Sequence, residues 1–205
     1  MNETANVTQV IDRKSNSLKR RLVFFLALLL VIAITVGLHL VYGLHPERLE
    51  GFKSHFYWGA FLVSIIGNAT IILPGAVLVI LSNIGLLIYP VLGLIGPIIV
   101  GLVGGAGAAI GEITGYVAGY SGREVVKRGK MYSRVEGWVS KWGTLTIFLF
   151  SLVPFIFDLV GLVAGVLRFP FWKFILICWL GRTILYVVLI SLAALGLKAV
   201  LPYSG

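Results

Sequence analysis

Charged residues are scarce in this chain: they make up 12% of its 205 residues, against about a quarter in ordinary soluble domains. Acidic residues are the scarcer kind, with 8 Asp+Glu against 17 Lys+Arg. The single cysteine, Cys178, excludes a disulfide framework within one chain and any cysteine cluster around a metal. The sequence also lacks the HExxH, P-loop and GxSxG motifs. We therefore expect no enzyme, no metal site and no cofactor.

Apolar residues take the place of charges, at 59% of the chain, and they gather in long runs. The basic residues lie beside these runs. In a soluble protein such an excess of positive charge would suggest nucleic acid. Beside apolar runs it indicates membrane orientation and contact with anionic headgroups. We therefore expect an integral membrane protein whose partners are membrane lipids and not nucleic acid.

The N-terminal part has the pattern of a basic tail followed by a first span. Residues 1–21 end in a basic cluster, and the apolar run 22–42 has about the 20 residues that a helix needs to cross a bilayer. A signal peptide would have a shorter apolar region and a small-residue cleavage site, so this span should stay uncleaved. Because basic flanks remain inside, we predict a multi-pass cell-membrane protein with a cytosolic N-terminus and a membrane domain over residues 43–205.

Two later apolar segments, residues 58–88 and 143–167, are interrupted near their centres. The interrupting residues are Asn68, Pro74, Gly75, Pro154 and Gly161. Proline removes a helical hydrogen bond, and irregular backbone is tolerated inside a bilayer only where protein or a wet cavity satisfies it. Each segment is therefore predicted to be a re-entrant hairpin that turns back before crossing.

The remaining apolar runs, residues 89–120 and 174–200, are long enough to span the bilayer. The basic loop over residues 121–141 should face the cytosol, so the two hairpins would enter from opposite sides. Broken apolar segments in corresponding halves are typical of an inverted repeat. The predicted fold class is thus an all-α integral membrane protein with spanning helices, two opposed re-entrant hairpins and a pseudo-inverted repeat.

Two carboxylates stand inside apolar runs, at Glu112 and Asp158. A carboxylate at such depth is expensive and normally faces the protein interior or a wet pathway, so both are candidates for proton or cation coupling. Tyr116 follows Glu112 by one helical turn, from which its hydroxyl could donate a hydrogen bond to the carboxylate. The alternative interpretation places Glu112 near cytosolic headgroups.

Arg182, in the last span, is the matching cation. Its guanidinium could pair with Asp158 or Glu112, or bind a lipid phosphate, because an arginine fork matches phosphate with two hydrogen bonds. A buried salt bridge that only fixes a hairpin is an equally good interpretation. Arg168 and Tyr116 complete the candidate headgroup-binding set, although Arg168 also suits an interfacial anchor.

Glycine recurs every four residues on one helix face. The positions are Gly107, Gly111, Gly115 and Gly119. Small residues at this spacing let two helix backbones approach closely, so packing is the favoured interpretation. An interface between copies in a homo-oligomer is the alternative.

Two stretches of the chain resemble the DedA family, whose domain is also called the VTT or SNARE-associated domain. They are GAGAAIGEITGYVAGYSGR, residues 105–123, and PFIFDLVGLVAGVLRFPFWKF, residues 154–174. The resemblance implies opposed re-entrant hairpins packed against spanning helices. It also implies lipid transport, either recycling of a polyprenyl-phosphate carrier, as in bacterial members, or phospholipid scrambling, as in eukaryotic relatives.

The chain departs from the family pattern in both hairpins. Bacterial members carry an acidic residue in the first hairpin, where this chain has Asn68, and arginines beside the second-hairpin proline, where it has Ser151 and Phe157. The leading hypothesis is a lipid flippase or scramblase, coupled to a proton through Glu112 and Asp158. Its alternatives are an ion-coupled transporter of a small solute and a membrane assembly factor without transport activity.

Overall fold

The computed structural model describes four long stretches of the chain and six residues of the N-terminal apolar run. The stretches are residues 46–69, 75–122, 130–153 and 157–200, and the six residues, each helical, are Leu26, Leu29, Ile32, Ala33, Val36 and Gly37. The predicted basic tail, most of the predicted first span, Pro74 and Pro154 therefore lie outside the described residues.

Helix is the only regular secondary structure in the described part of the chain, which confirms the predicted all-α class there. The helices are α2 (Pro46–Ala69), α3 (Ala76–Leu92), α4 (Ile95–Gly111), α5 (Ile113–Ser121), α6 (Lys130–Trp142), α7 (Thr144–Ser151), α8 (Phe157–Val166) and α9 (Phe171–Val200).

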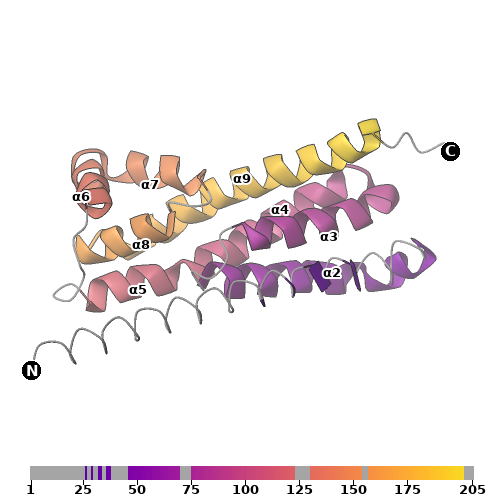
Figure 1. The fold of residues 1–205 in the computed structure, drawn as a ribbon, viewed down its shortest axis with the longest axis horizontal. Helices are drawn as coiled ribbons and strands as arrows, with labels where there is room; N and C mark the ends of the chain where they lie inside the picture. Colours follow the sequence, from indigo (N-terminus) through magenta and orange to yellow (C-terminus); the bar gives the residue numbers. More distant parts are fainter. Residues whose placement is uncertain are drawn as a thin grey trace, which may run out of the picture.

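The helices form an elongated bundle in which α9 runs along much of the length (Figure 1). Toward one end, α4 packs against α2, α3 and α9. Toward the other end, α5 and α8 lie side by side, and α6 and α7 cover α8. Two helix pairs, α2 with α3 and α7 with α8, are each joined through a short break, and the members of each pair contact one another.

Apolar side chains form two cores along this bundle. Fully buried members of the first core, between α2, α3, α4 and α9, are Ala60, Leu81, Val100, Ala108 and Ile190. Fully buried members of the second core, built from α7, α8 and α9 beside α5 and α6, are Ile147, Val160, Val163, Ala164, Phe174 and Cys178. The adjacent residues Ala108 and Ala109 belong to different cores, so the two cores meet near the end of α4.

The glycine stripe packs helices of this chain against each other. A Cβ atom at Gly107 or Gly111 would lie 2.5 Å from a backbone carbonyl oxygen of α2, that of Phe61 or Ile65. A Cβ atom at Gly119 would collide with the backbone of Leu162 in α8. These three glycines therefore permit backbone-to-backbone contact, as the packing interpretation predicts.

Two of the residues predicted to interrupt residues 58–88 are described, and the structure differs from the prediction at one of them. The interruption expected at Asn68 is wrong, because α2 continues through Asn68 to Ala69. The Asn68 amide nitrogen Nδ2 donates to the backbone carbonyl of Ser64, 2.7 Å away, so the polar side chain is satisfied without ending the helix. Gly75 does lie at a break, immediately before α3, with a φ of +93° that favours glycine.

One residue predicted to interrupt residues 143–167 also lies inside a helix. Gly161 lies inside α8, so its assignment as a break is wrong, and the interruption instead separates Ser151 at the end of α7 from Phe157 at the start of α8. A Cβ atom at Gly161 would lie 3.8 Å from the backbone oxygen of Glu112, an ordinary van der Waals distance. Gly161 therefore faces the junction of α4 and α5 without being required there by a close backbone contact.

The predicted span over residues 89–120 contains a helix end and a turn. α3 continues past residue 88 to Leu92, and α4 begins at Ile95. Glu112 separates α4 from α5, but it keeps helical angles of φ −66° and ψ −14°. Its N–H donates to Ala108 O at 2.9 Å, and the N–H of Tyr116 donates to Glu112 O at 3.2 Å. The two helices therefore continue one another across Glu112.

Candidate functional site

Glu112 and Arg182 form an ion pair in the interior of the bundle. Nη2 of Arg182 donates a hydrogen bond to Oε1 of Glu112 over 2.5 Å. Glu112 is 1% exposed and Arg182 is 2% exposed, so neither charge contacts bulk solvent. The sequence left both Asp158 and Glu112 open as partners of Arg182, and the structure shows Arg182 paired with Glu112.

The ion pair lies where the two apolar cores meet. Cys178 belongs to one core and Tyr186 to the other, and Arg182 lies one helical turn from each of them along α9. Burial of a charged group costs several kcal/mol per ion, which is offset only by good geometry and further hydrogen bonds. A pair in this position therefore either holds the helices of the bundle together or takes part directly in the function of the protein.

The glycines that adjoin Glu112 and Arg182 in the chain pack against two further helices. Gly111 precedes Glu112, and a Cβ atom there would lie 2.5 Å from the carbonyl oxygen of Ile65 in α2. Gly181 precedes Arg182, and a Cβ atom there would overlap the hydroxyl of Ser151 in α7. One member of each broken helix pair thus packs directly beside a residue that carries charge.

A hydrogen-bonded cluster of polar side chains follows one turn further along α9. Nδ2 of Asn68 lies 3.1 Å from the hydroxyl of Tyr186, and the hydroxyl of Ser64 donates to the carbonyl of Gly104 at 2.6 Å. Ser64 and Tyr186 are 0% and 2% exposed. The cluster joins α2, α4 and α9, and it extends the polar interior that begins at the ion pair.

Neither Ser64 nor Tyr186 was predicted from the sequence to belong to a functional site. The available signal was helical spacing, because Ser64 precedes Asn68 by four residues and Tyr186 follows Arg182 by four. Residues four apart lie on the same helix face. What the spacing could not indicate is that these two faces meet, since α2 and α9 are far apart in the chain.

The structure does not bring Tyr116 and Arg168 to the ion pair. The hydroxyl of Tyr116 does not donate to Glu112; it donates to the backbone carbonyl of Phe169 at 2.6 Å. Arg168 is exposed, and its guanidinium carbon lies 5.3 Å from the ring centre of Tyr120. Both residues lie around the contact of α5 with the end of α8, so their assignment to headgroup binding stays a prediction.

Asp158 occupies the first turn of α8, and its side chain lies outside the described part of the structure. Its predicted role in proton or cation coupling therefore stays a prediction. Within the described stretches, no group of three His, Cys, Asp or Glu side chains is placed to hold a metal ion.

Two stretches of the described chain are long and apolar enough to cross a membrane. They are Ile95–Ser121, which comprises α4 and α5, and Phe171–Gly196, which lies in α9. Glu112 stands in the first stretch and Arg182 in the second, so the ion pair joins two helical stretches of spanning length. This combination is the one expected of a helical membrane protein with a charged interior.

Comparison with known proteins assigns the family. The chain belongs to the VTT domain family, also called the DedA family, since the family model matches residues 73–195, more than half of its length. The matched range includes both residues of the ion pair, whereas Ser64 and Asn68 in α2 precede it.

A relative of uncharacterized function extends the comparison to a bacterium. An uncharacterized protein of Haemophilus influenzae is 25% identical over 96 residues, which cover 43% of this chain and 50% of the relative. The chain thus matches about half the length of that relative. No solved structure matches the chain significantly.

Proposed function

We propose that this chain moves a lipid with a phosphate headgroup across a membrane, as a flippase or scramblase. The substrate class comprises phospholipids and polyprenyl-phosphate carriers. The observation that carries the proposal is the buried pair of Glu112 and Arg182, which joins two spanning-length helical stretches of a VTT domain. Ionisable groups at such depth commonly mark a transport pathway.

Competition for the guanidinium of Arg182 is the proposed chemical step. A phosphate oxygen of the headgroup replaces Oε1 of Glu112, and the released carboxylate takes up a proton. The charge of the site is thereby conserved, because one anion at Arg182 is exchanged for another while Glu112 becomes neutral. Arginine suits this exchange because its planar fork binds carboxylate and phosphate in the same bidentate geometry.

The two broken helix pairs are the proposed moving parts. In this proposal α2–α3 and α7–α8 are the opposed re-entrant hairpins, and the N-terminus lies in the cytosol of a multi-pass protein. One helix of each pair packs beside the ion pair, through the contact of Gly111 with α2 and the contact of Gly181 with α7. Displacement of either hairpin would uncover one charged residue to a headgroup while the acyl tails stay in lipid.

Asp158 is the second proposed coupling group. It follows the break between α7 and α8, where a carboxylate at a helix start is favoured by the helix dipole. Protonation of Asp158 during movement of this hairpin would couple lipid transport to a proton.

Reconstituted vesicles that carry a fluorescent phospholipid test the proposal. The fraction of label reached by an impermeant reductant measures lipid movement between leaflets. We expect Arg182→Lys to move lipid at least about tenfold more slowly, since a point charge replaces the bidentate fork. Lys173→Gln, which removes an exposed charge from the same helix, is the control and should behave as the wild type.

A second candidate function follows from the enclosure of the polar residues. The ion pair is buried and the Ser64–Asn68–Tyr186 cluster lies close to it in the bundle, and polar groups held inside the protein in this way favour an ion-coupled transporter of a small solute. Solute uptake into the same vesicles, without movement of labelled lipid, would favour that function. A folded protein that moves neither lipid nor solute would indicate an assembly factor.

A further inference from the structure

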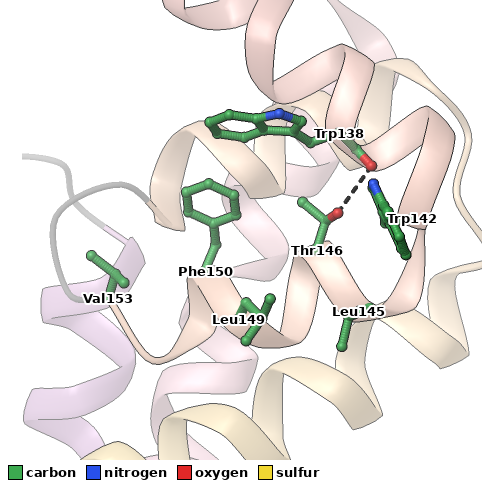
Figure 2. Close-up of a pocket in the computed structure, with 7 residues that line it drawn as sticks. All are labelled: Trp138, Trp142, Leu145, Thr146, Leu149, Phe150 and Val153. Carbon is green, nitrogen blue, oxygen red and sulfur yellow. Dashed lines mark hydrogen bonds between the residues drawn. The ribbon is translucent and has the colours of Figure 1, made fainter.

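A groove outside the ion-pair region lies where α6 turns into α7. It has a volume of about 420 Å³, within the range of about 300–1,000 Å³ that is typical of small-molecule sites. Figure 2 shows the side chains that line it: Trp138, Trp142, Leu145, Thr146, Leu149, Phe150 and Val153. None of these residues carries a charge, so the groove offers an apolar surface.

Contacts within the groove fix its shape. The indole ring of Trp138 stacks on the ring of Phe150, with 5.5 Å between centroids and an interplanar angle of 21°. The hydroxyl of Thr146 donates to the backbone carbonyl of Trp138 at 2.9 Å, as Figure 2 shows. This bond uses the single hydroxyl among the lining residues on the protein itself, so the lining favours a hydrocarbon over a polar ligand.

The groove is apolar but open. Trp142 is 57% exposed and Leu149 is 53% exposed, although burial of such apolar side chains away from water is favourable. A large apolar surface that a chain leaves uncovered commonly marks a binding site for another molecule.

Basic side chains lie beside this surface. Nζ of Lys141 lies 5.6 Å from the ring centre of Trp142, and Arg134 is exposed one turn before Trp138. α6 carries Lys130, Arg134 and Lys141 against the single acid Glu136. A hydrocarbon surface with a cationic edge is complementary to a molecule that has an acyl chain and an anionic headgroup.

We propose that this groove binds an anionic phospholipid, with one acyl chain against Trp138, Trp142 and Leu149 and the headgroup phosphate near Lys141 and Arg134. A second copy of the chain fits less well, since a symmetric contact would bring these cations toward their own counterparts. The inference goes beyond the proposed function, because such a lipid would anchor α6 and α7 whether or not the protein transports lipid.

Quenching of tryptophan fluorescence by brominated acyl chains tests the inference on the full chain in vesicles. Vesicles of phosphatidylcholine receive increasing amounts of either brominated phosphatidylglycerol or brominated phosphatidylcholine. We expect stronger quenching by the anionic lipid at equal mole fraction, and loss of this difference in the Trp138→Phe, Trp142→Phe double variant. Each of Lys141→Gln and Arg134→Gln should raise the half-saturating mole fraction about fivefold, since one cation contributes about 1 kcal/mol near an anionic surface.

A matched pair of exposed residues on α9 provides the control. Trp172 is 75% exposed and Lys173 is exposed beside it, yet neither lines the groove. Trp172→Phe with Lys173→Gln should lower total fluorescence and leave the preference for the anionic lipid unchanged. Equal quenching by both lipids, a preference that survives loss of Trp138 and Trp142, or groove tryptophans shielded from both lipids by a second copy would each overturn the inference. None of these outcomes depends on lipid transport, which the leaflet assay measures separately.

Discussion

The side chains of Asn68 and Tyr186, 118 residues apart in the chain, hydrogen-bond to each other inside the bundle. Nδ2 of Asn68 lies 3.1 Å from the tyrosine hydroxyl, and that hydroxyl lies 3.3 Å from Oδ1 of Asn68. Tyr186 follows Arg182 by one turn, so α2 is tied to the same part of α9 that holds the ion pair. A neutral amide thus stands near the charged site, and Glu112 is the carboxylate paired with Arg182.

This contact should stabilise the bundle by about 1 kcal/mol, the usual net contribution of a hydrogen bond. Tyr186→Phe removes the hydroxyl, and Asn68→Ala removes the amide that also bonds to Ser64. We expect Asn68→Ala to lower the free energy of unfolding more than Tyr186→Phe does, because it breaks more bonds. Denaturant unfolding in detergent of both single variants and the double variant gives the coupling energy, and additive effects would show that the two side chains do not interact.

Removal of one member of the ion pair should be far more destabilising than removal of both. Glu112→Gln leaves the Arg182 charge buried without its counter-ion, which costs about 3–5 kcal/mol. The double variant Glu112→Leu, Arg182→Met replaces the pair by apolar side chains and should recover most of that loss. Thermal unfolding measures these differences.

The same variants separate a structural role from a transport role. If the pair only locks the bundle, the apolar double variant should move lipid as the wild type does once its fold is restored. The proposed function predicts a stable but inactive protein instead. Near-normal lipid movement by a stably folded Glu112→Leu, Arg182→Met protein would falsify the exchange step at Arg182.

Close contact between α4 and α2 should make Gly107 sensitive to any side chain. A Cβ atom at this position would lie 2.5 Å from the carbonyl oxygen of Phe61, a backbone atom that can move only if the helices separate. Gly107→Ala should therefore lower the free energy of unfolding by about 1–3 kcal/mol, the usual range for overpacking. Gly137→Ala in α6 is the control, because a Cβ atom there meets nothing within 4 Å. That substitution should be neutral or stabilising by up to about 1 kcal/mol, as expected for glycine replaced inside a helix.

Tyr116 should prove a packing residue whose hydroxyl holds the end of α8. Its ring packs on Phe174 with 5.1 Å between centroids, and its hydroxyl donates to the carbonyl of Phe169. Tyr116→Phe keeps the ring and removes one hydrogen bond, so we expect a loss of about 1 kcal/mol in unfolding free energy and unchanged lipid movement. Slower transport by a fully folded Tyr116→Phe protein would instead restore the headgroup-binding role that the sequence predicts.

The class of protein could be predicted from the sequence, because hydrophobicity and breaks are properties of local stretches of chain. Scarce charge and long apolar runs predicted helices of membrane-spanning length, and the VTT resemblance was visible in residues 105–123 and 154–174. Glu112 and Arg182 could be recognised singly, since a charge inside an apolar run stands out wherever its partner lies. The exact interruptions were harder to predict, because Asn68 and Gly161 lower helix propensity and yet both lie inside helices. At Asn68 the side chain bonds to the carbonyl of Ser64 within the same helix.

Which residues of distant helices contact each other depends on the tertiary fold. Arg182 lies 70 residues from Glu112 in the chain and is much closer in sequence to Asp158, yet its partner in the structure is Glu112. Sequence separation does not predict this pairing, because it depends on which helices lie side by side. The cluster of Ser64, Asn68 and Tyr186 could not be predicted from the sequence for the same reason. Ser64 and Asn68 lie one turn apart in α2, so their polar side chains could bond locally without any contact with Tyr186 in α9. Contacts between distant helices depend on how their surfaces fit, and glycines such as Gly107 and Gly111 set that fit by allowing backbones to touch. Composition and spacing predict which residues share a face of one helix. Which faces of different helices contact each other is a property of the folded chain.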